Sequence, residues 1–429
     1  MASEQTFGAI LRNRDFVKLY IGQLGSGVGD RLHQMALLGV ILQVYGIANV
    51  TETARLVFFA TLPVLLFSLL AVAWTDRWSR KRTMVAADFL RAGFAFTIPL
   101  IRHFYPSVHA LYGVVFVMGT LATFHGPARL AAMPRIAEPR LLMAANSLCN
   151  SSGAVAGLLA IPVAGYVVQA LGPNPCFVID GFTFLFSGAL IALIARSLRP
   201  EKDAERAALS VEREGPGAST LDARRSTLHD MKAGVDYTLA HREALPLVLS
   251  GGLFALVSGL LLVELLAFAT AQLRLAEFGV GLLVAAGGLG MAAGLLLVSQ
   301  SPSLRHLASL PYLALIAMGC CIAAITLSLS PWLVALAMVG VGATAGMASV
   351  PADTRLQEIV PDARRGGVFS VKQLLAAMAF LSALWLQSGT HLLRGLSPSA
   401  VLVGLGALCS AGGVLLLLLH RAATRRPTA

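Results

Sequence analysis

Charged residues are scarce in this sequence: only 13% of its 429 residues are Asp, Glu, Lys or Arg, whereas 56% are hydrophobic. Soluble domains carry about 25% charged residues, so this composition excludes an ordinary soluble protein. The net charge of +11 does not indicate a nucleic-acid partner, because the basic residues stand in short clusters between apolar runs.

Several catalytic and ligand-binding motifs are also missing. The sequence has no Gly-x-x-x-x-Gly-Lys-Ser/Thr motif, which argues against ATP hydrolysis by this chain. Its five cysteines form no Cys-x-x-Cys pair, and no spacing of His, Cys and carboxylates is typical of a metal site. The serines show no nucleophile elbow. We therefore expect no enzyme activity, no cofactor, no metal and no disulfide, and the N-terminal residues predict no cleaved signal peptide.

Long apolar runs dominate what the sequence does contain. A hydrocarbon core of about 30 Å requires about 20 residues of apolar helix. Runs of this kind cover residues 16–46, 52–75, 83–102, 107–133, 141–170, 174–196, 244–271, 279–299, 309–329, 331–354, 366–394 and 398–420. We therefore predict an all-α membrane protein with twelve transmembrane helices.

A long polar segment at 197–243 divides these spans six and six. Its first part is charged and contains Gly and Pro, as flexible linkers do. Its second part has the spacing of an amphipathic helix, with Val235 and Leu239 on the apolar face. We predict a six-helix bundle at 1–196, a cytoplasmic linker with an amphipathic helix, and a second six-helix bundle at 244–429.

The distribution of basic residues predicts the orientation. If both termini face the cytoplasm, the inner segments hold the dense Arg and Lys clusters. The outer segments then hold only Arg55, Arg102, Arg274 and Arg394. The positive-inside rule favours this orientation.

The segment between the second and third spans reads AVAWTDRWSRKRTMVAADFLRAG. It resembles the loop Gly-x-x-x-Asp-Arg-x-Gly-Arg-Arg/Lys of the major facilitator superfamily, although Val72 and Ser79 stand where that family has glycine. The residues that match in register are Asp76, Arg77, Arg80 and Lys81. The resemblance implies a major facilitator fold of two six-helix bundles.

The same resemblance implies that the matching residues form a latch at the inner gate. A charge-assisted network at a helix end is strong when closed and can be hydrated when open. Asp88 and Arg91, which follow on one helical face, extend the predicted latch, and Arg129 at the end of the fourth span has a gate role. Asp180 and a network of Asp353, Arg355 and Glu358 are expected to be structural.

The fifth span contains SSGAVAGLLAIPVAGYVV. It is similar to the Gly-x-x-x-Gly-Pro-x-x-Gly-Gly pattern of antiporters in this family: Gly157, Pro162 and Gly165 match, whereas Ile161 and Tyr166 depart. Pro162 removes a backbone donor and should kink the helix, which suits a hinge. The alternative is ordinary packing, because Gly and Pro are common in membrane helices.

Further stretches, including RDFVKLYIGQLGSGVGDRLHQMAL, resemble the branch of siderophore (enterobactin-type) exporters and macrolide efflux pumps. This resemblance implies a monomeric antiporter of the bacterial inner membrane that exports a small amphipathic drug or siderophore in exchange for protons. One alternative is a lysophospholipid flippase. An alternative of another class is a transport-inactive sensor or assembly partner.

Three polar residues lie near the middle of the first span: Asp30, Arg31 and His33. An isolated charge at that depth costs at least about 2.5–3.5 kcal/mol. Adjacent residues on a helix point in different directions, so Asp30 and Arg31 do not face one partner. We predict that Asp30 takes up a proton or that Arg31 meets an anionic substrate group. The alternative is a purely structural role, which for His33 means packing.

The C-terminal half has fewer candidates. Glu264 lies midway along the seventh span without an evident local partner, and we predict that it is a cavity or proton site. Lys372 and Gln373 begin the eleventh span and are expected to line a central cavity.

Overall fold

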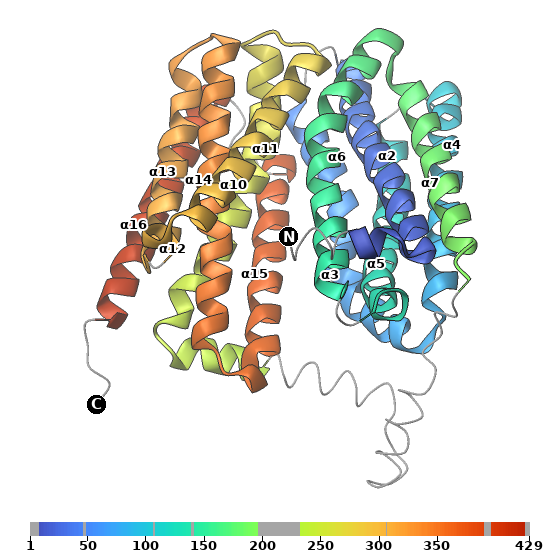
Figure 1. The fold of residues 1–429 in the computed structure, drawn as a ribbon. Helices are drawn as coiled ribbons and strands as arrows, with labels where there is room; N and C mark the ends of the chain where they lie inside the picture. The colour runs from blue at the N-terminus through green and yellow to red at the C-terminus, as the bar shows by residue number, and fades with distance from the viewer. Residues whose placement is uncertain are drawn as a thin grey trace, which may run out of the picture. The chain divides into compact units, whose positions relative to one another are not determined.

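The computed structural model describes residues 8–45, 49–105, 108–138, 141–195, 232–305, 307–389 and 396–424. Within these ranges the chain is helical and contains no β-strand (Figure 1), and twelve of its helices have fifteen residues or more. The predicted all-α fold with twelve long helices is therefore confirmed.

The chain divides into two compact units. The first unit comprises Met1–Gly46 and Phe59–Ala223, and the second comprises Ile47–Phe58 and Arg224–Ala429. Most of the predicted linker, residues 197–231, lies outside the described residues.

The first six long helices belong to the first unit, except that the opening residues of α3 are grouped with the second. They are α2 (Arg14–Tyr45), α3 (Val50–Arg77), α4 (Arg80–Phe104), α5 (His109–Ile136), α6 (Leu142–Leu171) and α7 (Pro173–Ala192). In this unit α2 packs against α6 and α7, and α4 packs against α5 and α7. These contacts bring mid-helix residues of α2, α4, α5 and α7 together.

The second unit holds the other six long helices. They are α10 (Ala244–Ala271), α11 (Glu277–Gln300), α13 (Leu310–Ala324), α14 (Pro331–Ile359), α15 (Asp362–Gly389) and α16 (Pro398–Thr424). A short helix, α12 (Pro302–Arg305), precedes α13, and a 3₁₀ turn, η2 (Ile325–Leu327), follows it. Here α10 packs against α15 and α16, and α11 packs against α14.

Among the described residues, ten helices are long and apolar enough, by length and composition, to cross a membrane. The helix α2 is as long as these but is interrupted by Asp30, Arg31 and His33, and the described residues of α6 include the apolar stretch Leu159–Leu171. These lengths and compositions are those of a multi-pass membrane protein.

Small residues allow the closest helix contacts of the second unit. A methyl group added at Gly342 would overlap the backbone carbonyl of Gly287, and one added at Gly290 would overlap that of Val339. Both pairs join α11 to α14, so the two backbones touch without intervening side chains. Close backbone approach of this kind is a main source of helix association in lipid.

A short helix at 232–240 precedes α10. Its residues Gly234, Tyr237 and Thr238 are buried, and the Tyr237 hydroxyl donates to the carbonyl of Ile359 at 3.1 Å. Leu239 is 65% exposed on the other face. The helix is thus two-faced, and its place at a membrane surface stays a prediction.

Candidate functional site

An ion pair joins the middle of α2 to the middle of α4 in the first unit. The Nη2 atom of Arg91 donates to Oδ1 of Asp30 at 2.6 Å. The Arg91 side chain is only 11% exposed, whereas that of Asp30 is 40% exposed. The guanidinium also lies over the ring of Phe184, with Cζ 3.9 Å from its centroid. A charge-assisted bond of this length is strong, and its acidic partner is the accessible one.

A second acid lies one helical turn from Arg91 on α4. Asp88 is 1% exposed, and neither of its carboxylate oxygens forms a hydrogen bond with any described residue. The nearest ionisable partner is His125 on α5, whose Nε2 lies 3.5 Å from Oδ1 of Asp88. That distance is too long for a good hydrogen bond. Arg91 therefore has one bonded acid, Asp30, and one nearby acid without a bond of its own.

Arg129 lies one turn beyond His125 on α5 and contacts Gln23 of α2. With the Gln23 amide oxygen turned toward the guanidinium, Nε and Nη1 of Arg129 donate to it at 2.8 and 3.2 Å. This contact lies within the first unit, so the predicted gate role of Arg129 stays a prediction.

A buried pair joins α2 to α7 one turn beyond Asp30. His33 Nδ1 and Asp180 Oδ2 are 3.0 Å apart, and the two residues are 8% and 0% exposed. The ring of Phe177 meets the imidazole edge to face. The pair holds α2 against α7 beside the Asp30 site. This contact is consistent with a structural role for both residues.

Asp30 and Arg31 turn to different neighbours. Whereas Asp30 meets Arg91 on α4, Arg31 Nη1 donates to Gln34 at 2.9 Å. The Arg31 guanidinium also lies beside Gly157 of α6, where a methyl group would be 3.7 Å from its Nε. That distance is an ordinary contact, so the arginine alone does not require a glycine here, and the hinge role of Gly157 stays a prediction. The other two hinge residues, Pro162 and Gly165, lie inside α6.

The predicted latch is only partly described. Arg80 Nη1 donates to the carbonyl of Ala131 at 3.0 Å, and Lys81 Nζ donates to the carbonyl of Ile194 at 2.7 Å. The side chains of Asp76 and Arg77 lie outside the described residues, so the latch stays a prediction.

One part of the latch interpretation needs correction. Asp88 and Arg91 were assigned to the latch because they follow its motif on one helical face. The structure instead places them at mid-helix, with Arg91 bonded to Asp30 and Asp88 facing His125.

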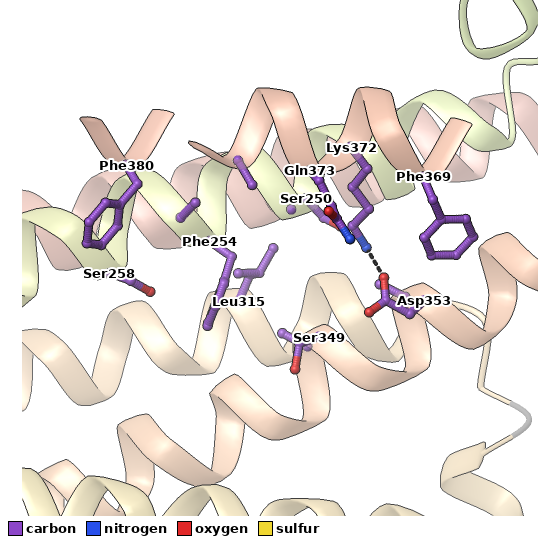
Figure 2. A pocket seen from close by; sticks show the side chains of 15 residues that line it. Ser250, Phe254, Ser258, Leu315, Ser349, Asp353, Phe369, Lys372, Gln373 and Phe380 are labelled. Atoms are coloured by element: carbon purple, nitrogen blue, oxygen red, sulfur yellow. Dashed lines mark hydrogen bonds and ion pairs between the residues drawn. The ribbon is translucent and has the colours of Figure 1, made fainter. Parts of the chain in front are cut away.

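The second unit contains a cavity of about 440 Å³ between α10, α13, α14 and α15 (Figure 2). Lys372 and Gln373 line it, and their place in a central cavity stays a prediction. Lys372 Nζ is paired with Asp353 Oδ1 at 2.5 Å. Asp353 also lines the cavity. Arg355 and Glu358 lie 3.7 Å apart, and a structural network that joins all three residues stays a prediction.

Glu264 lies in α10 and is 3% exposed. Its Oε1 accepts from Nε2 of Gln387 on α15 at 3.3 Å, and the same amide group donates to the carbonyl of Leu260 at 3.0 Å. Glu264 therefore has a partner that is distant in sequence, and it is absent from the residues that line the cavity of Figure 2.

No group of three or more His, Cys, Asp or Glu residues in the described part of the chain is arranged to hold a metal ion. Together, the apolar helices, the mid-helix ion pair and the cavity define a multi-pass membrane protein of the transporter class.

The sequence model of the Major Facilitator Superfamily matches residues 19–384. The chain belongs to this superfamily, whose members are transporters and not enzymes. The uncharacterized MFS-type transporter YkuC of Bacillus subtilis (strain 168) is 22% identical over 352 residues, which cover 76% of this chain and 78% of that protein.

Solved structures share the fold. A bacterial homologue of the iron transporter ferroportin in its inward-facing state matches with a TM-score of 0.68 and 16% identity, covering 96% of this chain and 99% of that chain. A POT family transporter in complex with 5-aminolevulinic acid matches with a TM-score of 0.70 and 14% identity, covering 96% and 97%. These structures show the fold, and the family model establishes the superfamily; the siderophore and macrolide branch stays a prediction.

Proposed function

We propose that this protein is a secondary active transporter that exports a small amphipathic molecule in exchange for protons by alternating access. The observation that carries the proposal is the Asp30–Arg91 pair. The Asp30 side chain is 40% exposed, whereas the Arg91 side chain is only 11% exposed, so the acid is the accessible member of the pair. A costly charged pair at mid-helix favours a functional role.

The arrangement around Arg91 supports a switch with two states. When Asp30 takes up a proton, its ion pair with Arg91 is lost, and a buried arginine without a partner is strongly unfavourable. Asp88 lies one turn away on the same helix and has no hydrogen bond of its own among the described residues. The Arg91 guanidinium can therefore exchange its ion pair with Asp30 for one with Asp88. Protonation of Asp30 thereby changes the contact that holds α2 to α4.

The amphipathic character of the substrate follows from the cavity in the second unit. Phenylalanine rings form part of its wall, and an ion pair forms another part. Sites of this type bury an apolar body and orient it with a few polar groups. The direction of transport and the inner-membrane location with cytoplasmic termini come from the resemblance and the basic-residue distribution.

The test uses purified protein in liposomes that contain a pH-sensitive dye. Lipophilic amines, siderophores and lysophospholipids are added one at a time under an imposed proton gradient. The proposal predicts proton flux that depends on at least one amphipathic compound. Movement of labelled lysophospholipid without a gradient would instead identify a flippase, and binding without any transport would identify a sensor. Either result would overturn proton-coupled export.

A further inference from the structure

The charged groups of the cavity in the second unit lie toward one end, beside Phe369 (Figure 2). In Figure 2 the Lys372–Asp353 pair lies toward one end of the cavity, and Phe380 and Ser258 lie toward the other. Phe254 lies between them. A ligand that fills this space meets the charged pair at one end and a mixture of aromatic, aliphatic and hydroxyl groups along the rest.

The hydroxyl groups of the cavity present acceptors. Ser250 Oγ donates its hydrogen to the carbonyl of Leu247 at 2.7 Å, and Ser349 Oγ donates to that of Ala345 at 3.0 Å. Each hydroxyl hydrogen is thus used within its own helix, and the oxygen lone pairs remain for a ligand. These two positions favour a ligand that donates hydrogen bonds.

The ion pair also favours a ligand that donates hydrogen bonds, because its acidic member is more exposed than its basic member. The Asp353 side chain is 48% exposed and no described residue hydrogen-bonds its second oxygen, whereas the Lys372 side chain is 11% exposed. The lysine stem lies against Gly251, where a methyl group would be 2.6 Å from Cε of Lys372. The carboxylate is therefore the more exposed member of the pair.

A charged ligand group that enters the cavity contacts the more exposed member of the pair, Asp353, first. An anion would meet Asp353 first and would have to displace it to reach Lys372. An ammonium group can bond to the free oxygen of Asp353 and leave the pair intact, so that no buried charge loses its partner.

We infer that this cavity binds amphipathic amines, with an N–H-bearing ammonium group at Asp353 and Ser349 and an apolar or aromatic body along Phe254 and Phe380. The inference rests on the proposed function and deepens it by naming the chemical class of the exported molecule.

The test measures binding to the purified full-length protein in detergent, without any gradient. The probes share one phenylbutyl body and differ in the end group: primary amine, trimethylammonium, alcohol and carboxylate. The primary amine is expected to bind at least about tenfold more tightly than the alcohol and the carboxylate. The trimethylammonium analogue keeps the charge but has no N–H donor, and its affinity is expected to lie between those of the primary amine and the alcohol. Equal or tighter binding of the carboxylate would overturn the inference.

Variants locate the site. Asp353→Asn alone leaves a buried lysine without its partner and can prevent folding, so the decisive variant combines Asp353→Asn with Lys372→Gln. It is expected to bind amine and alcohol equally well. Glu264→Gln is the matched control, because it makes the same acid-to-amide change in the same unit outside the cavity, and it should keep the preference.

The two proposals fail separately. Retention of the amine preference in the double variant would overturn the cavity assignment. If the wild-type protein binds amines but shows no compound-dependent proton flux, proton coupling is overturned and the binding site stands.

Discussion

Replacing Gly29 by alanine should weaken the first unit by an amount that the structure defines. Gly29 precedes Asp30 on α2 and faces α7. An added methyl group would overlap Oγ1 of Thr183 and would lie 2.5 Å from Oδ1 of Asp180, which His33 holds in place. Overpacking of this kind costs about 1–3 kcal/mol, and an alanine in a helix regains about 0.5–1 kcal/mol relative to glycine. The two ranges combine to a net loss of about 0–2.5 kcal/mol, and because two side-chain atoms lie closer than 3.0 Å to the added methyl group, we expect a loss of about 1–2 kcal/mol within that range.

The same helix provides graded controls. At Gly25 the nearest atom to an added methyl group is Cδ1 of Phe186 at 3.4 Å, an ordinary contact, so Gly25→Ala should be neutral or slightly stabilising. At Gly22 the nearest atom is Oγ of Ser187 at 3.2 Å, so Gly22→Ala should be intermediate. For a unit of this size, about 1–2 kcal/mol corresponds to a fall of about 2–8 °C in melting temperature.

Unfolding of the first unit can be followed with a thiol-reactive dye. Cys176 on α7 is a free, fully buried thiol, and it reports on this unit once the other cysteines are replaced by alanine. The reasoning is refuted if Gly29→Ala melts at the same temperature as Gly25→Ala. Because the methyl group pushes α2 away from α7, Gly29→Ala should also weaken gradient-driven transport.

Two further predictions concern other contacts. Lys81→Met removes the 2.7 Å bond to the Ile194 carbonyl and should lower the stability of the first unit by about 1 kcal/mol in the same thiol assay; an unchanged melting curve would show that the bond contributes nothing. Glu264→Gln should leave folding and ligand affinity unchanged, because the new amide keeps an acceptor for Gln387 and lies outside the cavity. A large loss of affinity, measured by calorimetry, would contradict that placement.

The helices could be predicted well from the sequence, for a physical reason. In a bilayer the backbone must satisfy its hydrogen bonds within the segment, so an apolar run of sufficient length is a helix. The expected span 174–196 corresponds to α7 at Pro173–Ala192, and 244–271 coincides with α10. The span at 309–329 ends as a 3₁₀ turn, a local change that hydropathy does not report.

The candidate site could be predicted only in part. A charge at mid-span is conspicuous in any sequence, which is why Asp30 and Glu264 were found. Their partners were not found, because Arg91 is 61 residues from Asp30 and Gln387 is 123 residues from Glu264. Pairing at such distances is decided by how helices pack.

Arg91 shows how proximity in sequence can mislead. It follows a recognisable loop motif and was therefore attached to it, although helix geometry carries it about three turns away from Arg80, to the level of Asp30. For Asp353 the sequence indicated only Arg355 and Glu358, which are close in sequence, and did not reveal Lys372, which is close in space.

The most direct test of the central claim separates proton coupling from substrate movement in Asp30→Asn. Liposomes with the variant are loaded with an amine that elicits proton flux in the wild-type protein. Exchange of labelled amine is measured first without a gradient, and accumulation is then measured with one. Asp15→Asn is the control, because Asp15 lies on the same helix but pairs with Lys18, away from the site. We predict that Asp30→Asn retains exchange and loses gradient-driven accumulation, whereas the control keeps both. Full gradient-driven accumulation in Asp30→Asn would contradict the account.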